Sequence, residues 1–146
     1  MLKKPIFLLR ALMVLLVVIQ FFRPDRSNPP ANPAATFESV AKPTVELTAV
    51  VSRACYNCHS NNTVWPWYSR VAPISWLVAN DVHGGRAHMN FSEWGSLSAE
   101  VAHRRLQDAC DEVQAGDMPP WQYRLVLPEA RLTPQDVKVI CAASGR

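Results

Sequence analysis

The chain has 146 residues, which is room for one globular domain, and a formal net charge of +3. The charge is concentrated at the start: residues 1–26 carry five basic side chains and one acidic one, so the remainder carries ten basic and eleven acidic side chains. A near-neutral domain with no basic stripe is a poor nucleic-acid binder, and that class of partner is excluded.

An apolar run opens the chain. Residues 6–22 read IFLLRALMVLLVVIQFF, follow Lys3 and Lys4, and are apolar except for Arg10 and Gln20. This pattern is typical of an export segment, which is either cleaved or retained as an anchor. As a helix it would cover about 25 Å, slightly less than a hydrocarbon core of about 30 Å. Residues 21–26, FFRPDR, offer no small-residue cleavage site, so we interpret residues 1–26 as a single uncleaved transmembrane helix.

The lysines before this run predict that the N-terminus lies in the cytoplasm and the domain in the periplasm, as in a single-pass protein of the bacterial inner membrane. The alternative is a soluble periplasmic protein formed by cleavage. Residues 27–43 contain four prolines among Ser, Asn and Ala without apolar periodicity, which predicts an extended tether. The globular domain is then residues 44–146.

Helical periodicity predicts a mostly α domain, and no alternating strand pattern competes with it. A domain of about 100 residues with short helices has a small core, which a large apolar cofactor would supplement. Four helices are expected: one capped by Thr44 with Leu47, Val51 and Ala54 on one face; one from Pro73 to about His83, closed by Gly84 and Gly85; one capped by Ser98 and ended by Gly116; and one that begins at Thr133 and Pro134.

Residues 55–59 read CYNCH, the attachment sequence of c-type haem. Cys55 and Cys58, three residues apart in a helical turn, place both sulfurs on one side, where each can form a thioether with a haem vinyl group. His59 can then bind the iron from the proximal face. The alternatives are a zinc site, which needs a second compact ligand pair, a thioredoxin-like dithiol, which needs a βαβ setting, and a structural disulfide.

Met118 is the best candidate for the distal iron ligand. It lies in AGDMPPWQY, where Gly116 ends the preceding helix and two prolines restrict the loop. A His/Met pair is typical of an electron carrier. The alternative for Met118 is a core residue that fills a gap. Four other side chains are weaker candidates: Met89, His83, His88 and His103.

Two further strings, NNTVWPWYSRVAPISWLVANDVHGGRAHMNFSEWG and GDMPPWQYRLVLPEARLT, accompany CYNCH. Together, from about Ala54 to Thr133, they resemble the small bacterial haem-binding domain family, single-haem c-type cytochrome-like proteins that often carry an N-terminal membrane segment. The resemblance implies a mostly α fold, one haem c attached to Cys55 and Cys58, and His59 and Met118 as iron ligands. Relatives often have a histidine before PEA, where this chain has Leu127.

Other residues carry weaker expectations. Cys110 and Cys141 both lie on apolar helix faces, so they form either a disulfide or two buried thiols. Arg70 and Arg86 could neutralise the haem propionates. The aromatic residues are expected in the core: Trp65, Trp67, Tyr68, Trp76, Trp94 and Trp121.

The sequence therefore predicts a membrane-anchored c-type cytochrome-like protein that transfers single electrons to or from redox partner proteins at the membrane, with the chemistry carried by the haem. The alternative function is a haem-based redox or gas sensor with a labile distal ligand. No sequence feature beside Met118 resembles a distal acid–base pair, so an enzyme such as a peroxidase is the weakest reading.

Overall fold

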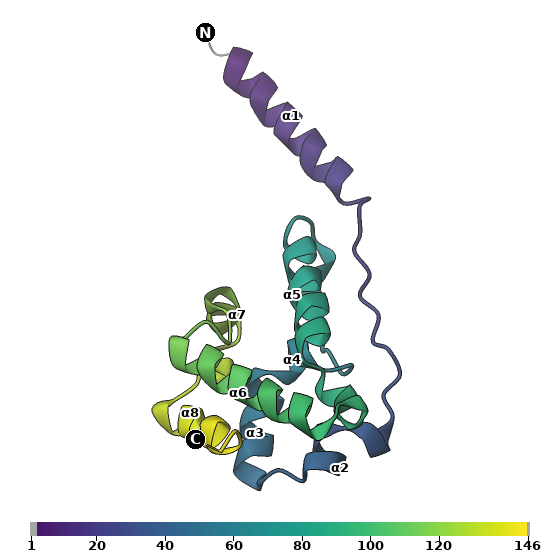
Figure 1. The fold of residues 1–146 in the computed structure, drawn as a ribbon. Helices are drawn as coiled ribbons and strands as arrows, with labels where there is room; N and C mark the ends of the chain where they lie inside the picture. The colour runs from purple at the N-terminus through teal and green to yellow at the C-terminus, as the bar shows by residue number, and fades with distance from the viewer. Residues whose placement is uncertain (1–2, 146) are drawn as a thin grey trace.

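The computed structural model describes residues 3–145, which are mostly helical and contain no strand (Figure 1). The mostly α prediction is confirmed. The α-helices of the described range are α1 (Lys3–Ile19), α2 (Phe37–Ala41), α3 (Val45–Ala54), α4 (Tyr56–His59), α5 (Ile74–His88), α6 (Ala99–Ala115), α7 (Trp121–Val126) and α8 (Pro134–Ala142). Short 3₁₀ helices lie at Pro33–Ala35 (η1), Trp67–Arg70 (η2), Phe91–Ser96 (η3) and Pro128–Ala130 (η4).

Three predicted helices begin where their capping residues indicated. The hydroxyls of Thr44, Ser98 and Thr133 accept backbone N–H groups at the starts of α3, α6 and α8. Thr133 also forms a reciprocal capping box with Asp136. Gly116 ends α6 with φ of 80°, a left-handed conformation that glycine adopts at no steric cost.

Helix α5 is longer than predicted, because it continues through Gly84 and Gly85 to His88. Glycine was expected to end this helix, but its small size serves a packing role instead. A Cβ atom at Gly85 would lie 2.6 Å from the backbone oxygen of Cys58, so α5 and α4 approach too closely for any other residue. Tertiary packing therefore outweighs the low helix propensity of glycine here.

Helix α1 corrects the predicted anchor. It ends at Ile19 after 17 residues, or about 25 Å, and it includes Lys3, Lys4 and Arg10. Within residues 3–145, none of the helices combines the length and the apolar character that crossing a membrane requires. The predicted transmembrane helix, and with it the single-pass location in the inner membrane, is therefore wrong.

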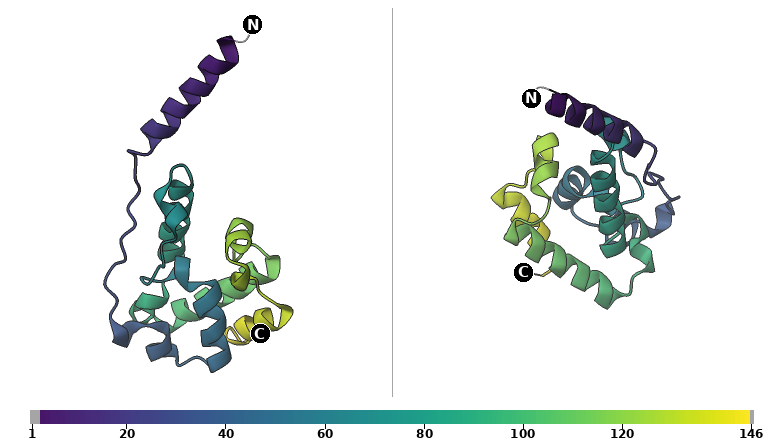
Figure 2. Two further views of the ribbon diagram at one scale, coloured as in Figure 1. Left: turned by 180° about the vertical axis from the view of Figure 1, so that it is seen from behind. Right: turned by 90° about the horizontal axis from the view of Figure 1, so that it is seen from above.

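The chain between α1 and α3 runs along the helical domain (Figures 1 and 2). The Gln20 side-chain amide bonds both backbone groups of Ala72, and Trp76 Nε1 donates to the Phe22 oxygen. Further along, the Phe37 side chain of α2 is buried, with an exposed fraction of 1%. The segment predicted as a tether thus contributes a side chain to the core, which its proline-rich composition did not indicate.

Phe37 lies in an aromatic cluster at the centre of the core. Its ring packs edge-on against Phe91 and Trp94, and the Tyr56 ring lies against Phe91. Most of the aromatic residues expected in the core are elsewhere: Trp94 is buried, but Trp67 and Trp121 are exposed. The aliphatic members of the cluster come from α3 and α8: Leu47, Val50, Val51 and Ile140.

Two devices attach α8 to the rest of the domain. One is a disulfide between Cys110 of α6 and Cys141 of α8. It closes a loop of 31 residues, which corresponds to about 3–4 kcal/mol in the chain-entropy account.

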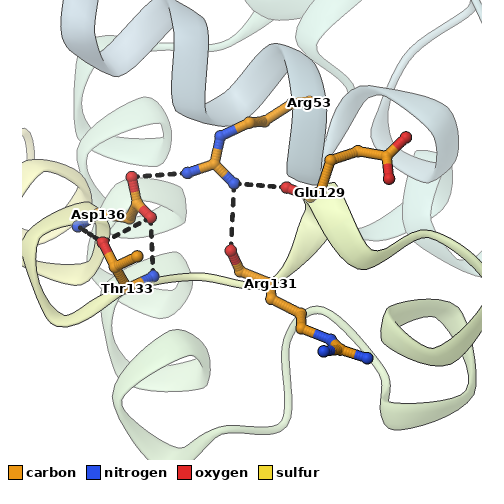
Figure 3. A network of polar contacts seen from close by, with 5 residues as sticks. All are labelled: Arg53, Glu129, Arg131, Thr133 and Asp136. Atoms are coloured by element: carbon orange, nitrogen blue, oxygen red, sulfur yellow. Dashed lines mark hydrogen bonds and ion pairs between the residues drawn. The ribbon is translucent and has the colours of Figure 1, made fainter.

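The other device is the guanidinium of Arg53, near the end of α3 (Figure 3). It donates to the backbone oxygens of Glu129 and Arg131 and pairs with Asp136 at 2.7 Å. Burial acts to raise the pKa of Asp136, but the donors of Arg53 and Thr133 outweigh it and hold that pKa below its ordinary value. The ionised carboxylate therefore ties the start of α8 to α3.

The packing of α2 yields a stability prediction. We expect Phe37→Ala to lower the free energy of unfolding by about 3–5 kcal/mol, because it leaves a cavity in the aromatic cluster. Phe21→Ala is the matched control: Phe21 is 82% exposed, so its loss should change the free energy by less than about 0.5 kcal/mol. Chemical denaturation followed by circular dichroism measures both. Equal, small effects would show that residues 33–41 do not belong to the folded core.

Candidate functional site

The CYNCH sequence forms a single helical turn at the end of α3. Cys55 ends α3, and its backbone oxygen accepts the N–H groups of Cys58 and His59 at 3.1 and 2.9 Å. Cys55 and Cys58 are both free thiols. Burial raises the pKa of Cys55 to about 12 and that of Cys58 to about 11.

The imidazole of His59 is held by Met89, the residue that directly follows α5. Its Nδ1 lies 3.0 Å from the backbone oxygen of Met89. Because a carbonyl oxygen only accepts, Nδ1 must carry the proton, which leaves Nε2 as the nitrogen with a free lone pair. Burial lowers the pKa of His59, although the backbone oxygens of Met89 and Gly85 oppose the shift. A neutral, oriented imidazole of this kind suits metal ligation.

A cavity of about 370 Å³ lies beside this turn. Its walls come from one face each of α5 and α6, where lining residues recur at helical spacing, and from the CYNCH turn and the loop into α7. Helix α5 and its end supply Asp81, Gly84, Gly85, His88 and Met89, and α6 supplies Arg105, Asp108, Ala109, Glu112 and Val113. The CYNCH turn and the residue before it supply Ala54, Cys55, Cys58 and His59. The loop into α7 and the start of that helix supply Met118, Pro119, Pro120 and Tyr123.

The cavity brings together the four residues that the sequence singled out: Cys55, Cys58, His59 and Met118 all line it. The Met118 side chain is 38% exposed. Its backbone N–H bonds the oxygen of Glu112, so the loop is attached to the last turns of α6. The other methionine candidate, Met89, also lines the cavity but packs against the aromatic cluster.

The histidine candidates differ in whether they line the cavity. His88 lines the cavity, whereas His83 does not. His103 lies on the exposed side of α6 and contacts Gln107. Leu127, where relatives often have a histidine, is half-buried at the end of α7 and is not part of the cavity wall.

Arg86 has a different role from the one expected. Its guanidinium donates to the backbone oxygens of Ser60 and Ser27, to Asn28 Oδ1 and to Thr63 Oγ1. It therefore fastens residues 27–28 to the loop that follows the CYNCH turn. Neither Arg86 nor the exposed Arg70 lines the cavity.

Two polar residues that the sequence did not single out connect the cavity walls. Asn57, inside the CYNCH turn, donates from Nδ2 to the Tyr123 hydroxyl of α7 at 2.8 Å. Asn57 also accepts the N–H of Val64 and the hydroxyl of Thr63. Burial raises the pKa of Tyr123 to about 12, so the phenol is neutral at physiological pH. No sequence motif marks this pair, because the contact is made only in the folded chain.

A family model described as a haem-binding domain matches residues 14–143. The chain belongs to the haem-binding domain family. It is therefore a haem-binding protein, and the predicted resemblance is confirmed. Neither a curated protein nor a solved structure matches the chain.

The cavity fits a haem. Its wall is largely apolar, and Gly84 faces open space where a side chain would otherwise project, which suits a flat ligand. Two thiols, a neutral imidazole and a thioether line the cavity, and imidazole and thioether are both known haem-iron ligands. The competing readings fit less well. The described residues contain no cluster of three His, Cys, Asp or Glu side chains that could hold a metal ion, and raised thiol pKa values are the opposite of those in a reactive dithiol.

The contact of α5 with the CYNCH turn yields a prediction on two adjacent glycines. Gly85→Ala should reduce both stability and haem content, because its Cβ would overlap the Cys58 backbone, which must then move. Gly84→Ala meets no protein atom within 4 Å and should stabilise the helix of the haem-free protein by up to about 1 kcal/mol. Thermal unfolding and the haem-to-protein absorbance ratio measure both. Indistinguishable variants would contradict the close packing of α4 and α5.

Proposed function

We propose that this haem-binding protein is a c-type, cytochrome-like electron carrier with one haem attached through thioethers to Cys55 and Cys58. The observation that carries the proposal is the cavity wall itself, to which both thiols, His59 and Met118 contribute. The haem supplies one-electron chemistry at its iron. The role of the chain is to bind, orient and tune it, and no residue is assigned a catalytic task.

The two thiols are suited to attachment. Each thioether forms by addition of one S–H across one vinyl group, with no leaving group, so two cysteines account for both vinyl groups of a single haem. Arg53 ties the end of α3, directly before the turn, to residues 129–136, and α5 packs against the turn itself where Gly85 meets Cys58. This rigidity supports a defined position for the group that the turn holds.

His59 and Met118 are the residues that would bind the haem iron. The hydrogen bond to Met89 orients the His59 ring and leaves Nε2 free. Met118 belongs to a loop restricted by Pro119 and Pro120 and attached to α6. His/Met ligation favours the reduced iron and is typical of electron carriers, so the partners we propose are redox proteins that donate or accept single electrons.

The thioethers are tested one at a time. Cys55→Ala and Cys58→Ala should each retain haem after extraction with acidified organic solvent, because one thioether bond remains. The reduced haem of each variant in alkaline pyridine should absorb at longer wavelength than that of the wild type, because one vinyl group remains conjugated. The double variant should lose its haem on extraction. A double variant that keeps haem through extraction would contradict attachment at these residues.

Met118 is tested against Met89. The wild type should be six-coordinate and low-spin, with the weak far-red band of methionine ligation in its oxidised spectrum. Met118→Ala should remove the band, lower the reduction potential and let carbon monoxide bind.

Met89→Ala is the matched control, because it truncates a second methionine of the cavity wall while the backbone oxygen that holds His59 remains. It should leave the band in place. A wild-type protein that is already high-spin and binds carbon monoxide at once would contradict the electron-carrier proposal and favour a haem-based sensor.

A further inference from the structure

A bound haem brings two propionate carboxylates, which need positive partners in or beside the cavity. The wall contains three carboxylates of its own, from Asp81, Asp108 and Glu112. Among the described residues that line the cavity, Arg105 is the only arginine or lysine. We propose that Arg105 of α6 binds a haem propionate and thereby sets the orientation of the haem. This inference rests on the haem of the proposed function.

The guanidinium of Arg105 is available for a new partner. It is about one-third exposed and lies 3.7 Å from Asp108, whose side chain is half exposed. An ion pair of that length between partly exposed side chains contributes little to stability. A propionate could instead accept two parallel N–H bonds from the planar guanidinium, which is the stronger geometry.

The order of charges along α6 favours one end of the cavity as the position of the haem propionates. Arg105 and Glu112 are seven residues apart, or about 10 Å along the helix axis. Glu112 lies beside the Met118 loop, because its backbone oxygen accepts the N–H of Met118. A propionate near Glu112 would be repelled by its carboxylate, whereas one near Arg105 would be attracted. Asp108 offsets part of this attraction at the Arg105 end, but its side chain is half exposed and therefore well screened by solvent. The charges therefore favour a haem whose propionates lie toward Arg105, the one lining cation among the described arginines and lysines.

The neighbouring arginines do not compete for this role. The donors of Arg86 are directed to Ser27, Asn28, Ser60 and Thr63. Arg104, next to Arg105 in sequence, is exposed, pairs with Glu100 and does not line the cavity. Arg104 is therefore a matched control, since it carries the same charge on the same helix.

The test titrates the full-length chain, isolated without haem, with haemin and with haemin dimethyl ester, in which both propionates are uncharged. Arg105→Gln should weaken haemin binding by about tenfold and leave binding of the ester unchanged, because only haemin offers the carboxylate. Arg105→Lys should lose less affinity for haemin than Arg105→Gln does. Arg104→Gln should bind both ligands with the affinity of the wild type. Retained ester binding shows that a variant still folds around the ligand.

A second measurement uses the protein with haem attached. Loss of the Arg105 charge should raise the pKa of the propionate, so the pH-dependent step in the reduction potential should move to higher pH in Arg105→Gln only. Equal weakening of both ligands, or no weakening of either, would overturn the role of Arg105. Mature wild-type protein that carries no haem would overturn the proposed function as well. Protein with attached haem, in which Arg105→Gln leaves the pH dependence of the reduction potential unchanged, would overturn this inference alone.

Discussion

The close approach of α5 to the CYNCH turn is the contact on which the site depends. A Cβ at Gly85 would lie 2.6 Å from the Cys58 oxygen, so only glycine permits the two backbones to meet at this point. Met89 directly follows this helix, its N–H bonds the Gly85 oxygen, and its own oxygen accepts the His59 Nδ1–H. Helix α5 and the residue that ends it therefore contact both the turn that presents the thiols and the imidazole that follows it. The remaining walls of the cavity are arranged around this fixed side.

The opposite side of the cavity is attached by different means. Helix α6 is joined to α8 by the Cys110–Cys141 disulfide, and Arg53 ties α8 back to α3, which leads into the CYNCH turn. The Met118 loop is attached to the end of α6 and, through Tyr123 and Asn57, to the turn itself. The thioether, the thiols and the imidazole thus belong to segments distant in sequence but connected by covalent or hydrogen-bonded contacts. A ligand that bridges His59 and Met118 would join the two sides directly.

Local signals in the sequence were sufficient for part of this structure. Thr44, Ser98 and Thr133 marked helix starts, because a hydroxyl that caps orphan N–H groups acts within one turn of its own position. The CYNCH spacing and the residues around Met118 indicated the cofactor, because these signals too lie within short stretches of sequence. Contacts between distant segments were not visible: the glycines of α5 were interpreted as a helix end, Phe37 fell within the predicted tether, and the hydrogen bonds of Arg86 to residues 27, 28, 60 and 63 were not predicted. The apolar run of α1 was assigned to a membrane, although as a helix it ends at Ile19.

The central claim is that the CYNCH turn holds the haem covalently, and mass spectrometry of a single fragment tests it most directly. Trypsin cleaves after Arg53 and Arg70, which releases residues 54–70 with both Cys55 and Cys58. The account predicts that this fragment from the mature protein carries the mass of one haem and has no thiol that reacts with an alkylating reagent. A fragment of unmodified mass with two reactive thiols, from protein that contains haem, would contradict it.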